Sequence, residues 1–567
     1  MKKLTKLLAL LLTLAMIFSV LAACSSDKDK KNDGGTTTTT PSGGDTGGDP
    51  APDGDKAPSG GSDPAPSGGD KDYTLQIGFM TPNGTHDPNA AGMTNRTQIQ
   101  TVFQRLFEQD PVTKEMKPWL ATSAEYIDDL TLQIKLRDDV YFTDGQHMTS
   151  KDVFYCYRDY WAAGFMSSYF ECYDWDASEI VDDYTINFKF TKEYGPAVTY
   201  LGSWAIYCYE DMPYGDNKSD SDKWFSAPNG TGPYYCVENV ASAYVTYQRK
   251  DAADYWGELP ECEKVTYRYY SESSTMYIDF ESGAIDAACA ISSQDAERVL
   301  AGDCPSFTGY YLNSIRDVLM LILPEETAMF DDIRVREAFF KSVDRTNVAL
   351  AMYGPLFIDA DSILPASVKY YESQKTVDYD PEGAKALLAE AGYPDGISLR
   401  LIVTMDMQDL AEALQASLAA GGINISVESY DPGTAIPMLR DMESDFICKQ
   451  AEGGAYIDEP GLLLDTLSPV STLPPAGMQD PAWAAAFDEA LYNTDSDKRA
   501  EGYAKLQEWA ANEYRVVPMC ERANMLIYNT DKLASFVLNC ADEPCPQYAV
   551  FNRSSLILTM AASDRTA

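Results

Sequence analysis

The residues best suited to chemistry occur in this chain without the spacing that most enzymes need. There are only two histidines, too few for a histidine-based metal centre, and the HExxH, GxSxG, Walker and kinase patterns are missing. The 87 Asp and Glu residues are so abundant that any two could be called a glycosidase pair, since their separation is not visible in sequence. Gly230-Thr231-Gly232 has no lysine placed to bind phosphate. These patterns count against catalysis.

The first cysteine points to a different kind of chemistry. A basic start precedes an apolar stretch from Leu7 to Val20, which is too short for a confident membrane span, and Leu21-Ala22-Ala23-Cys24 follows. This segment resembles a bacterial lipobox, which implies cleavage before Cys24 and diacylation of its sulfur. The alternative is an ordinary cleaved signal peptide with a coincidental cysteine.

The remaining cysteines do not define a disulfide framework. Of the 12 cysteines, 11 are left after Cys24, an odd number, and no CxxC occurs. Cys540 and Cys545 are close enough in sequence to pair across a tight loop. The other interpretation is that most of them are small buried thiols, because free cysteine packs as a small apolar residue.

Charge and composition limit the partners of the protein. There are 44 Lys and Arg against 87 Asp and Glu, for a net charge of −43. Such a field repels phosphate backbones, so no nucleic-acid partner is expected. Residues 25–72 are Gly, Ser, Thr, Pro, Asp and Lys with almost nothing apolar, which predicts a disordered tether before a folded region that begins near Tyr73.

The clearest local pattern is a strand, a turn and a capped helix. Apolar and polar residues alternate over residues 132–136 as in a half-buried strand, and Asp144-Gly145 is typical of a turn. Thr149, followed three residues later by Asp152, predicts a capping box, and apolar residues at helical spacing follow. Packing alone explains this pattern, so it predicts a scaffold and no catalytic site.

This block resembles the family-5 extracytoplasmic solute-binding proteins of ABC importers, the dipeptide- and oligopeptide-binding group. The resemblance is carried by Leu136, Arg137, Asp144, Gly145, Thr149, Asp152 and Val153. Asp139 departs from the glycine that is common in the family. Further sequence elements match those of the family and occur in the same order, at residues 230–235, 280–286, 332–338 and 515–518. The resemblance therefore extends from about Tyr73 to about Asn529.

Other segments have patterns of their own. Residues 97–107 have an apolar helical face, and residues 398–427 read as strand, helix and strand, which predicts a parallel βαβ unit. The aromatic residues between Trp161 and Trp175 form either a core or a wall for stacking on a ligand. His86 lies in a loop that faces the ligand in the resembling family, either as a contact or as a solvated loop residue.

The resemblance implies an α/β, two-lobed periplasmic-binding-protein-like fold of class II with an extra subdomain on lobe one. The expected parts are a lipoprotein signal peptide (1–24), a disordered linker (25–72), lobe one (73–107), its accessory subdomain (108–229), lobe one continued (230–322), lobe two (323–508) and a return to lobe one (509–567).

The resemblance also places ligand contacts on both lobes. They are Met93, Thr94, Cys289, Ser292, Met320, Gly454, Tyr456 and Asp458. Many peptide-binding members hold the peptide's α-amino group with an aspartate, but alignment on Glu459-Pro460 puts Tyr456 there. A neutral phenol cannot pair with an ammonium as a carboxylate does. Asp458 takes over the amine if the loop shifts by two residues, and Tyr456 stacks on a sugar or an apolar side chain or packs within the lobe.

The expected function is therefore capture of a solute, with a peptide as the expected ligand, outside the cell and its delivery to an ABC permease. No cofactor or metal is expected, and the only membrane contact is the lipid on Cys24, at the extracytoplasmic face of a bacterial cell membrane. Two alternatives stay open. The ligand could be an oligosaccharide or another small solute, or the protein could be an extracellular hydrolase that uses an acidic pair.

Overall fold

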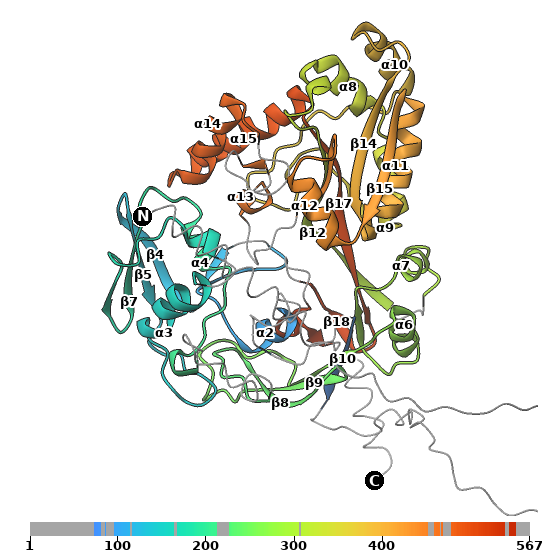
Figure 1. Cartoon of the computed structure of the whole chain (residues 1–567). Coiled ribbons are helices and arrows are strands. Elements are labelled where there is room, and N and C mark those ends of the chain that lie inside the picture. Colours follow the sequence, from blue (N-terminus) through green and yellow to red (C-terminus); the bar gives the residue numbers. More distant parts are fainter. Residues whose placement is uncertain are drawn as a thin grey trace, which may run out of the picture. The chain divides into compact units, whose positions relative to one another are not determined.

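The computed structural model describes a large part of the chain beyond the leader and linker. The described residues are 73–80, 86, 96–113, 116–163, 167–211, 226–304, 308–451, 459–464, 467–468, 478–538 and 544–551. All of them belong to the unit formed by residues 62–567. Figure 1 shows that helices and strands alternate along this unit, so the predicted α/β class is confirmed.

The largest sheet has nine strands, in the order β16-β12-β17-β11-β1-β10-β9-β8, with β13 paired to β17 off this path. Strand β1 is parallel to both β10 and β11, and the other neighbours are antiparallel. The strands are β1 (Thr74–Phe79), β8 (Tyr234–Val240), β9 (Tyr244–Arg249), β10 (Lys264–Tyr269), β11 (Ala287–Cys289), β12 (Thr308–Ile322), β13 (Phe357–Asp359), β16 (Ile447–Ala451) and β17 (Val516–Asn529).

Two long strands, β12 and β17, link the packed regions of the unit (Figure 1). Their antiparallel pairing ends at Ile322 and Val516, and the Leu323 N–H then donates to the Arg515 carbonyl at 2.8 Å. Leu526 of β17 packs with residues of β1, β9 and β10, whereas Val517 packs with residues of β14 (Ile397–Thr404) and β15 (Ile423–Tyr430). The same pair of strands therefore contributes to two separate hydrophobic cores.

A four-stranded sheet, in the order β4-β5-β7-β6, contains the strand predicted at residues 132–136. Leu132 and Ile134 are fully buried, and the Thr149 N–H donates to the Asp152 carboxylate at 2.8 Å, as a capping box requires. Helix α3 continues as a wider π-helical turn, Cys156–Trp161. The elements are β4 (Ala121–Asp128), β5 (Thr131–Leu136), β6 (Glu179–Asp182), β7 (Thr185–Lys189) and α3 (Ser150–Tyr155).

The helix predicted for residues 97–107 is shorter than expected, because α2 spans Arg96–Val102 and Phe107 already begins a strand. The Val102 carbonyl at the helix end accepts a hydrogen bond from the Gly232 N–H at 2.8 Å, so its acceptor is satisfied from outside the helix. A Cβ at Gly230 would lie 2.1 Å from the Val102 oxygen. The Gly-Thr-Gly segment thus allows two backbones to approach closely.

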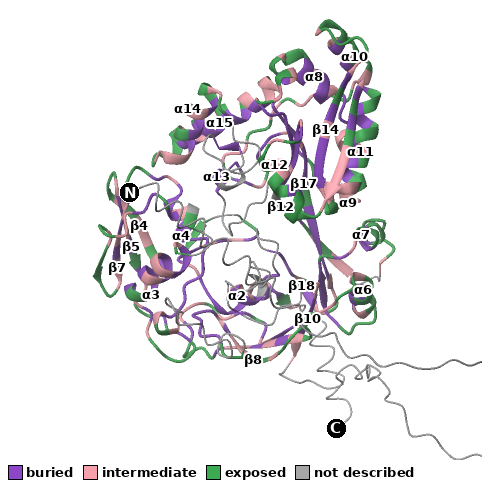
Figure 2. Ribbon diagram, in the orientation of Figure 1, coloured by how far each residue is buried: buried purple, intermediate pink, exposed green. Residues whose placement is uncertain are grey.

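The predicted βαβ unit is confirmed. Strands β14 (Ile397–Thr404) and β15 (Ile423–Tyr430) are parallel neighbours, and α11 (Gln408–Ala420) connects them. Helix α11 packs with both strands in one hydrophobic core through Leu410, Leu414 and Leu418, which are fully buried, while its opposite face is exposed (Figure 2). This is the amphipathic pattern expected of a helix that covers one face of a sheet.

Two of the remaining helices begin where their caps predict. Asp332 accepts from the Arg334 N–H at the start of α8, and Asp380 accepts from the Gly383 N–H at the start of α10. The helices are α4 (Ala197–Leu201), α6 (Ser273–Glu281), α7 (Ser293–Leu300), α8 (Ile333–Lys341), α9 (Arg345–Tyr353), α10 (Pro381–Glu390), α12 (Pro432–Arg440), α13 (Pro460–Leu463), α14 (Pro481–Tyr492) and α15 (Ser496–Glu513). Short strands complete the fold: β2 (Phe107–Gln109), β3 (Met116–Pro118), β18 (Leu533–Ser535) and β19 (Val550–Phe551).

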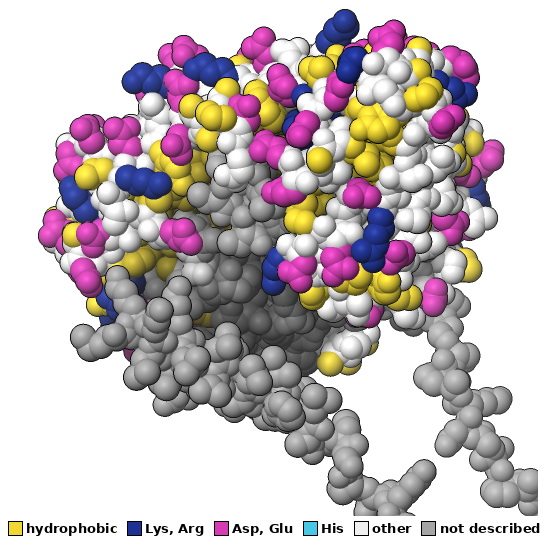
Figure 3. Space-filling view, turned by 45° about the horizontal axis from the view of Figure 1, so that its top comes forward, with side chains coloured by type: hydrophobic (Ala, Val, Ile, Leu, Met, Phe, Trp, Pro, Cys, Tyr) yellow, Lys and Arg dark blue, Asp and Glu magenta, His cyan; other side chains and the backbone are white. Residues whose placement is uncertain are grey.

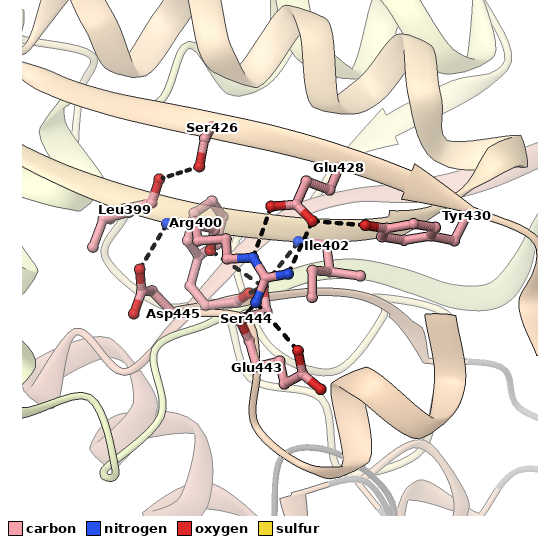
Figure 4. Close-up of polar contacts among 10 residues, drawn as sticks. Leu399, Arg400, Ile402, Ser426, Glu428, Tyr430, Glu443, Ser444 and Asp445 are labelled. Atoms are coloured by element: carbon pink, nitrogen blue, oxygen red, sulfur yellow. Dashed lines mark hydrogen bonds and ion pairs between the residues drawn. The ribbon is translucent and has the colours of Figure 1, made fainter. Parts of the chain in front are cut away.

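A polar network ties β14 to β15 and to the turn after α12 (Figure 4). Arg400 donates to both carboxylate oxygens of Glu428, at 2.8 and 2.9 Å, and to the Glu443 carbonyl at 3.0 Å. The Arg400 backbone N–H donates to Asp445 at 2.6 Å. Hydrogen bonding, first from Arg400 and then from Tyr430, lowers the pKa of Glu428 to about 2.

The depressed pKa of Glu428 predicts a pH-dependent contribution to stability. Glu428→Gln should lower the melting temperature at pH 7, because the wild-type carboxylate is ionised and bonded to Arg400 in the folded state. Wild type should lose this advantage as the pH falls from the ordinary value of 4.5 through about 2. Thermal unfolding of both proteins at pH 7, 4.5, 3 and 2 measures the difference. A difference that is unchanged at pH 2 would contradict the assignment.

The surface agrees with the acidic composition. Figure 3 shows Asp and Glu side chains spread over the visible face of the molecule, in keeping with the net charge of −43. Among the described residues, no helix is both long and apolar enough to cross a membrane.

Candidate functional site

Six of the predicted functional residues lie outside the described residues. They are Cys24, Met93, Thr94, Gly454, Tyr456 and Asp458. Their roles therefore stay predictions. The segment that holds the last three ends directly before Glu459, which is described, and the surroundings of Glu459 define the candidate site.

The three described members of the predicted set lie in different surroundings. Cys289 ends β11 and is fully buried in the core that contains β1, whereas Met320 of β12 is 1% exposed in a separate core with Trp483. Ser292 is partly buried and caps α7, because its hydroxyl accepts from the Asp295 N–H at 3.0 Å and donates to the Asp295 carboxylate at 2.7 Å. The structure does not bring the three side chains together, and their contact with a ligand stays a prediction.

Glu459 is held by a buried ion pair that the sequence did not reveal. The Arg499 Nη2 lies 2.7 and 2.9 Å from the two Glu459 oxygens, and the Tyr503 hydroxyl donates to Glu459 at 2.9 Å. The side chains of Arg499 and Glu459 are 7% and 1% exposed. The Arg499 Nε also donates to the Ala490 carbonyl at 2.8 Å, so helix α15 fixes both the cation and the acid.

The electrostatics of this pair follow from its burial. Burial by itself would lower the pKa of Arg499, but the adjacent Glu459 carboxylate raises it above its ordinary value. Burial, together with the Glu459 charge, raises the pKa of Tyr503 well above its usual range. The Tyr370 ring stacks on Tyr503 with centroids 5.2 Å apart. The Glu459 side chain is therefore held between Arg499 and Tyr503.

The same arginine borders a contact with the loop before α4. A Cβ at Gly195 would lie 2.2 Å from the Asn493 carbonyl oxygen and 2.7 Å from the Arg499 Cδ. The Lys192 ammonium lies 3.2 Å from the centre of the Tyr492 ring. Only a residue without a side chain allows this approach, so Gly195 sets the spacing between the loop and the α14–α15 connection.

His86 is buried, and the sequence interpretation as a solvated loop residue is wrong. It is 0% exposed, and its Nε2 lies 2.8 Å from the Tyr247 hydroxyl of β9. Thr101 and Tyr267 form a similar pair of hydroxyl groups at 2.8 Å on the neighbouring strand. The His86 ring therefore ties the segment after β1 to the sheet.

The aromatic residues between Trp161 and Trp175 lie largely within the core, as one of the two sequence interpretations predicted. Trp161, Phe170 and Tyr173 are 3%, 3% and 5% exposed and belong to the core that also contains β5. Several cysteines are buried free thiols, as the second cysteine interpretation predicted; they include Cys156, Cys262, Cys448 and Cys520. Within the described part of the chain, no group of His, Cys, Asp and Glu is arranged to hold a metal ion.

Two cores linked by the strand pair β12 and β17 give the unit the α/β organisation of a two-lobed binding protein. The comparison with known families agrees, because residues 115–471 match the middle region of the bacterial extracellular solute-binding proteins, family 5. The chain belongs to this family. The predicted resemblance and the solute-binding function are thereby confirmed.

Known proteins similar to this chain include both sequence relatives and solved structures. A Brucella ovis protein, provisionally named as an ABC transporter peptide-binding protein, is 27% identical over 494 residues, covering 78% of this chain and 88% of that protein. Among solved structures, NikA from Brucella suis in complex with Fe(III)-EDTA has a TM-score of 0.73 at 21% identity, over 85% of this chain and 100% of that chain. DppA from Helicobacter pylori in complex with the peptide STSA has a TM-score of 0.64 at 21% identity, over 81% and 94%. These likenesses confirm the fold.

Proposed function

We propose that the protein captures a peptide outside the cell and delivers it to the permease of an ABC importer. The main support is the family match together with the Brucella ovis relative, whose name gives both the peptide and the ABC transporter. The Helicobacter pylori structure of the same fold holds a peptide. The protein supplies binding and no chemistry, since the family is one of solute-binding proteins.

Capture proceeds by closure of two lobes around the solute. Lobe one comprises residues 73–107 and 230–322 with an accessory subdomain at 108–229, lobe two comprises 323–508, and 509–567 returns to lobe one. The strands β12 and β17, which pair antiparallel and enter two cores, support a hinge at their junction. A solute that contacts both lobes shifts the equilibrium between the open and closed forms toward the closed form. The permease recognises this closed form.

The mature protein is tethered to the extracytoplasmic face of the membrane through Cys24. The support is Leu21-Ala22-Ala23-Cys24 behind a basic and apolar leader. Residues 25–72 then act as the flexible linker that keeps the binding unit near its permease.

Cys24→Ala tests the anchor. The variant should leave the membrane fraction or stay as an unprocessed precursor, because two acyl chains give stable attachment where one is marginal. Fractionation of cells that express each protein, with detection of the binding unit by antibody, measures this outcome. A variant that stays in the membrane fraction as tightly as wild type, after correct processing, contradicts the proposal.

The ligand is recognised without the usual aspartate for a free α-amino group. Tyr456 occupies that position in the alignment on Glu459-Pro460, and the buried Arg499–Glu459 pair fixes this anchor of the loop. Recognition of the amine is therefore absent or transferred to Asp458. An oligosaccharide is the second candidate ligand, because Tyr456 offers a ring face for stacking on a sugar.

Calorimetric titration separates these ligands. Di- to hexapeptides are compared with an oligosaccharide panel, and each peptide is tested with and without N-acetylation. Peptide binding that survives acetylation supports the proposed recognition. Binding that is lost on acetylation and in Asp458→Asn, but is retained in Tyr456→Phe, contradicts it and indicates ordinary N-terminus recognition. Turnover of any bound compound would instead favour the hydrolase alternative.

A further inference from the structure

A pocket lies beside residues 547–550, and neither Glu459 nor Arg499 lines it. Its volume is about 370 Å³, within the range of about 300–1,000 Å³ that is usual for small-molecule sites. Its walls come from the end of α2, from strand β2, from the link between β9 and β10, and from residues 547–550. None of the ligand contacts predicted from the sequence lines it.

One carboxylate in this pocket has no partner within the described part of the chain. Glu108 of β2 lines the pocket, is partly exposed, and makes neither a side-chain hydrogen bond nor an ion pair there. Burial, partly offset by the charge of Arg105, raises its pKa to about 7. A half-buried carboxylate without a partner gains from an ammonium group placed beside it.

The other walls of the pocket are rigid and aromatic. Gln104 is 6% exposed and is bonded on both sides, because its Nε2 donates to the Tyr255 hydroxyl at 3.0 Å and its Oε1 accepts from the Trp256 Nε1 at 3.2 Å. Trp119 meets Trp256 edge to face with centroids 5.3 Å apart. Trp119 and Tyr255 both line the pocket, so ring faces and edges border the space beside Glu108.

The charges around the pocket favour a cation. The lining of the pocket includes one cationic residue, Arg105, and three acidic residues, Glu108, Glu258 and Glu261. Beyond these, Asp110 and Lys117 are bonded to each other at 2.7 Å and act on Glu108 with opposite signs. The net charge of the lining is therefore negative, and the lining combines a half-buried acid with aromatic rings, which attract organic cations.

We propose that this pocket is a second binding site, for a small organic ammonium ion with an aromatic or apolar body, in which Glu108 pairs with the ammonium. The site goes beyond the proposed solute capture, because its lining residues differ from those predicted to contact the transported solute. Its ligand would bind whether or not a peptide occupies the candidate site.

The 2-phenylethylammonium ion is a suitable probe, and 2-phenylethanol is its uncharged match. Calorimetry on the whole mature protein at pH 8 should detect one site for the ammonium and at least tenfold weaker binding of the alcohol. Glu108→Gln should lower the affinity for the ammonium ion about tenfold or more, because a charge-assisted pair is replaced by a neutral contact. Glu179→Gln, on β6 and outside the lining of the pocket, should leave its affinity unchanged.

The pH dependence gives an independent readout. Affinity for the ammonium should fall about tenfold from pH 8 to pH 6 in wild type, since Glu108 takes up a proton around pH 7 while the probe stays charged. The Glu108→Gln variant should lack this dependence. Absence of binding at pH 8, equal affinity in wild type and Glu108→Gln, or equal affinity for the alcohol would each overturn the proposal.

Discussion

Replacing Arg499 with methionine is expected to lower the free energy of unfolding by about 3–5 kcal/mol, the largest single effect on stability that we predict. The reason is the buried partner. Glu459 is 1% exposed, and it accepts two hydrogen bonds from Arg499 and one from Tyr503. Removal of the cation leaves its carboxylate without a counter-charge in a site that excludes water. Equilibrium denaturation with urea measures the loss.

Two controls make this prediction specific. Lys505, on the same helix α15, forms an ion pair with Glu489. That pair is exposed, so Lys505→Met should change the midpoint of urea unfolding little. The double variant Arg499→Met/Glu459→Leu removes both charges and should recover most of the lost stability, because no unpaired charge then remains buried. If Arg499→Met lowers the free energy of unfolding no more than Lys505→Met does, the Arg499–Glu459 pair does not stabilise the fold in the way described.

The second large effect concerns ligand affinity. Gly195→Ala should weaken solute binding about tenfold or more. The added Cβ would lie 2.2 Å from the Asn493 carbonyl oxygen, so the contact between this loop and the α14–α15 connection must open. We expect this contact to form on closure, so the variant lowers the population of the binding-competent closed state, and the apparent affinity falls with it.

A matched control is available for this variant. Gly433 at the start of α12 also lacks a positive φ, and a Cβ there would meet only an oxygen of Asp431, at 3.1 Å. Gly433→Ala should therefore leave affinity unchanged. Calorimetry with the bound solute compares the three proteins. Equal affinity for wild type and Gly195→Ala would show that the contact plays no part in closure.

Local elements were predictable because neighbouring residues determine them. The capping box of Thr149 and Asp152 and the βαβ unit at residues 398–427 are found as predicted, since capping and amphipathic periodicity depend on residues within one turn or one strand. The length of α2 was not predictable in this way. Its end depends on Gly230 and Gly232, which are more than a hundred residues away and approach the Val102 carbonyl only in the folded chain.

The candidate site was accessible from the sequence only in part. Glu459-Pro460 could be placed through the family resemblance, but Arg499 lies forty residues further on in a helix of ordinary amphipathic pattern, and nothing in its sequence context predicts burial. His86 was misjudged for a related reason. Polar loop residues are usually solvated, and its partner Tyr247 is supplied by a strand that is distant in sequence.

The claim that this protein captures a solute is tested most directly by a native mass spectrum of the mature protein, purified without added ligand. We expect a species heavier than the polypeptide by the mass of one solute, which disappears after unfolding and refolding and returns when the released compound is added back. Fragmentation of that compound then identifies it as peptide, oligosaccharide or another solute. A spectrum with only the bare polypeptide mass, together with no binding of any peptide or oligosaccharide by calorimetry, would contradict the account.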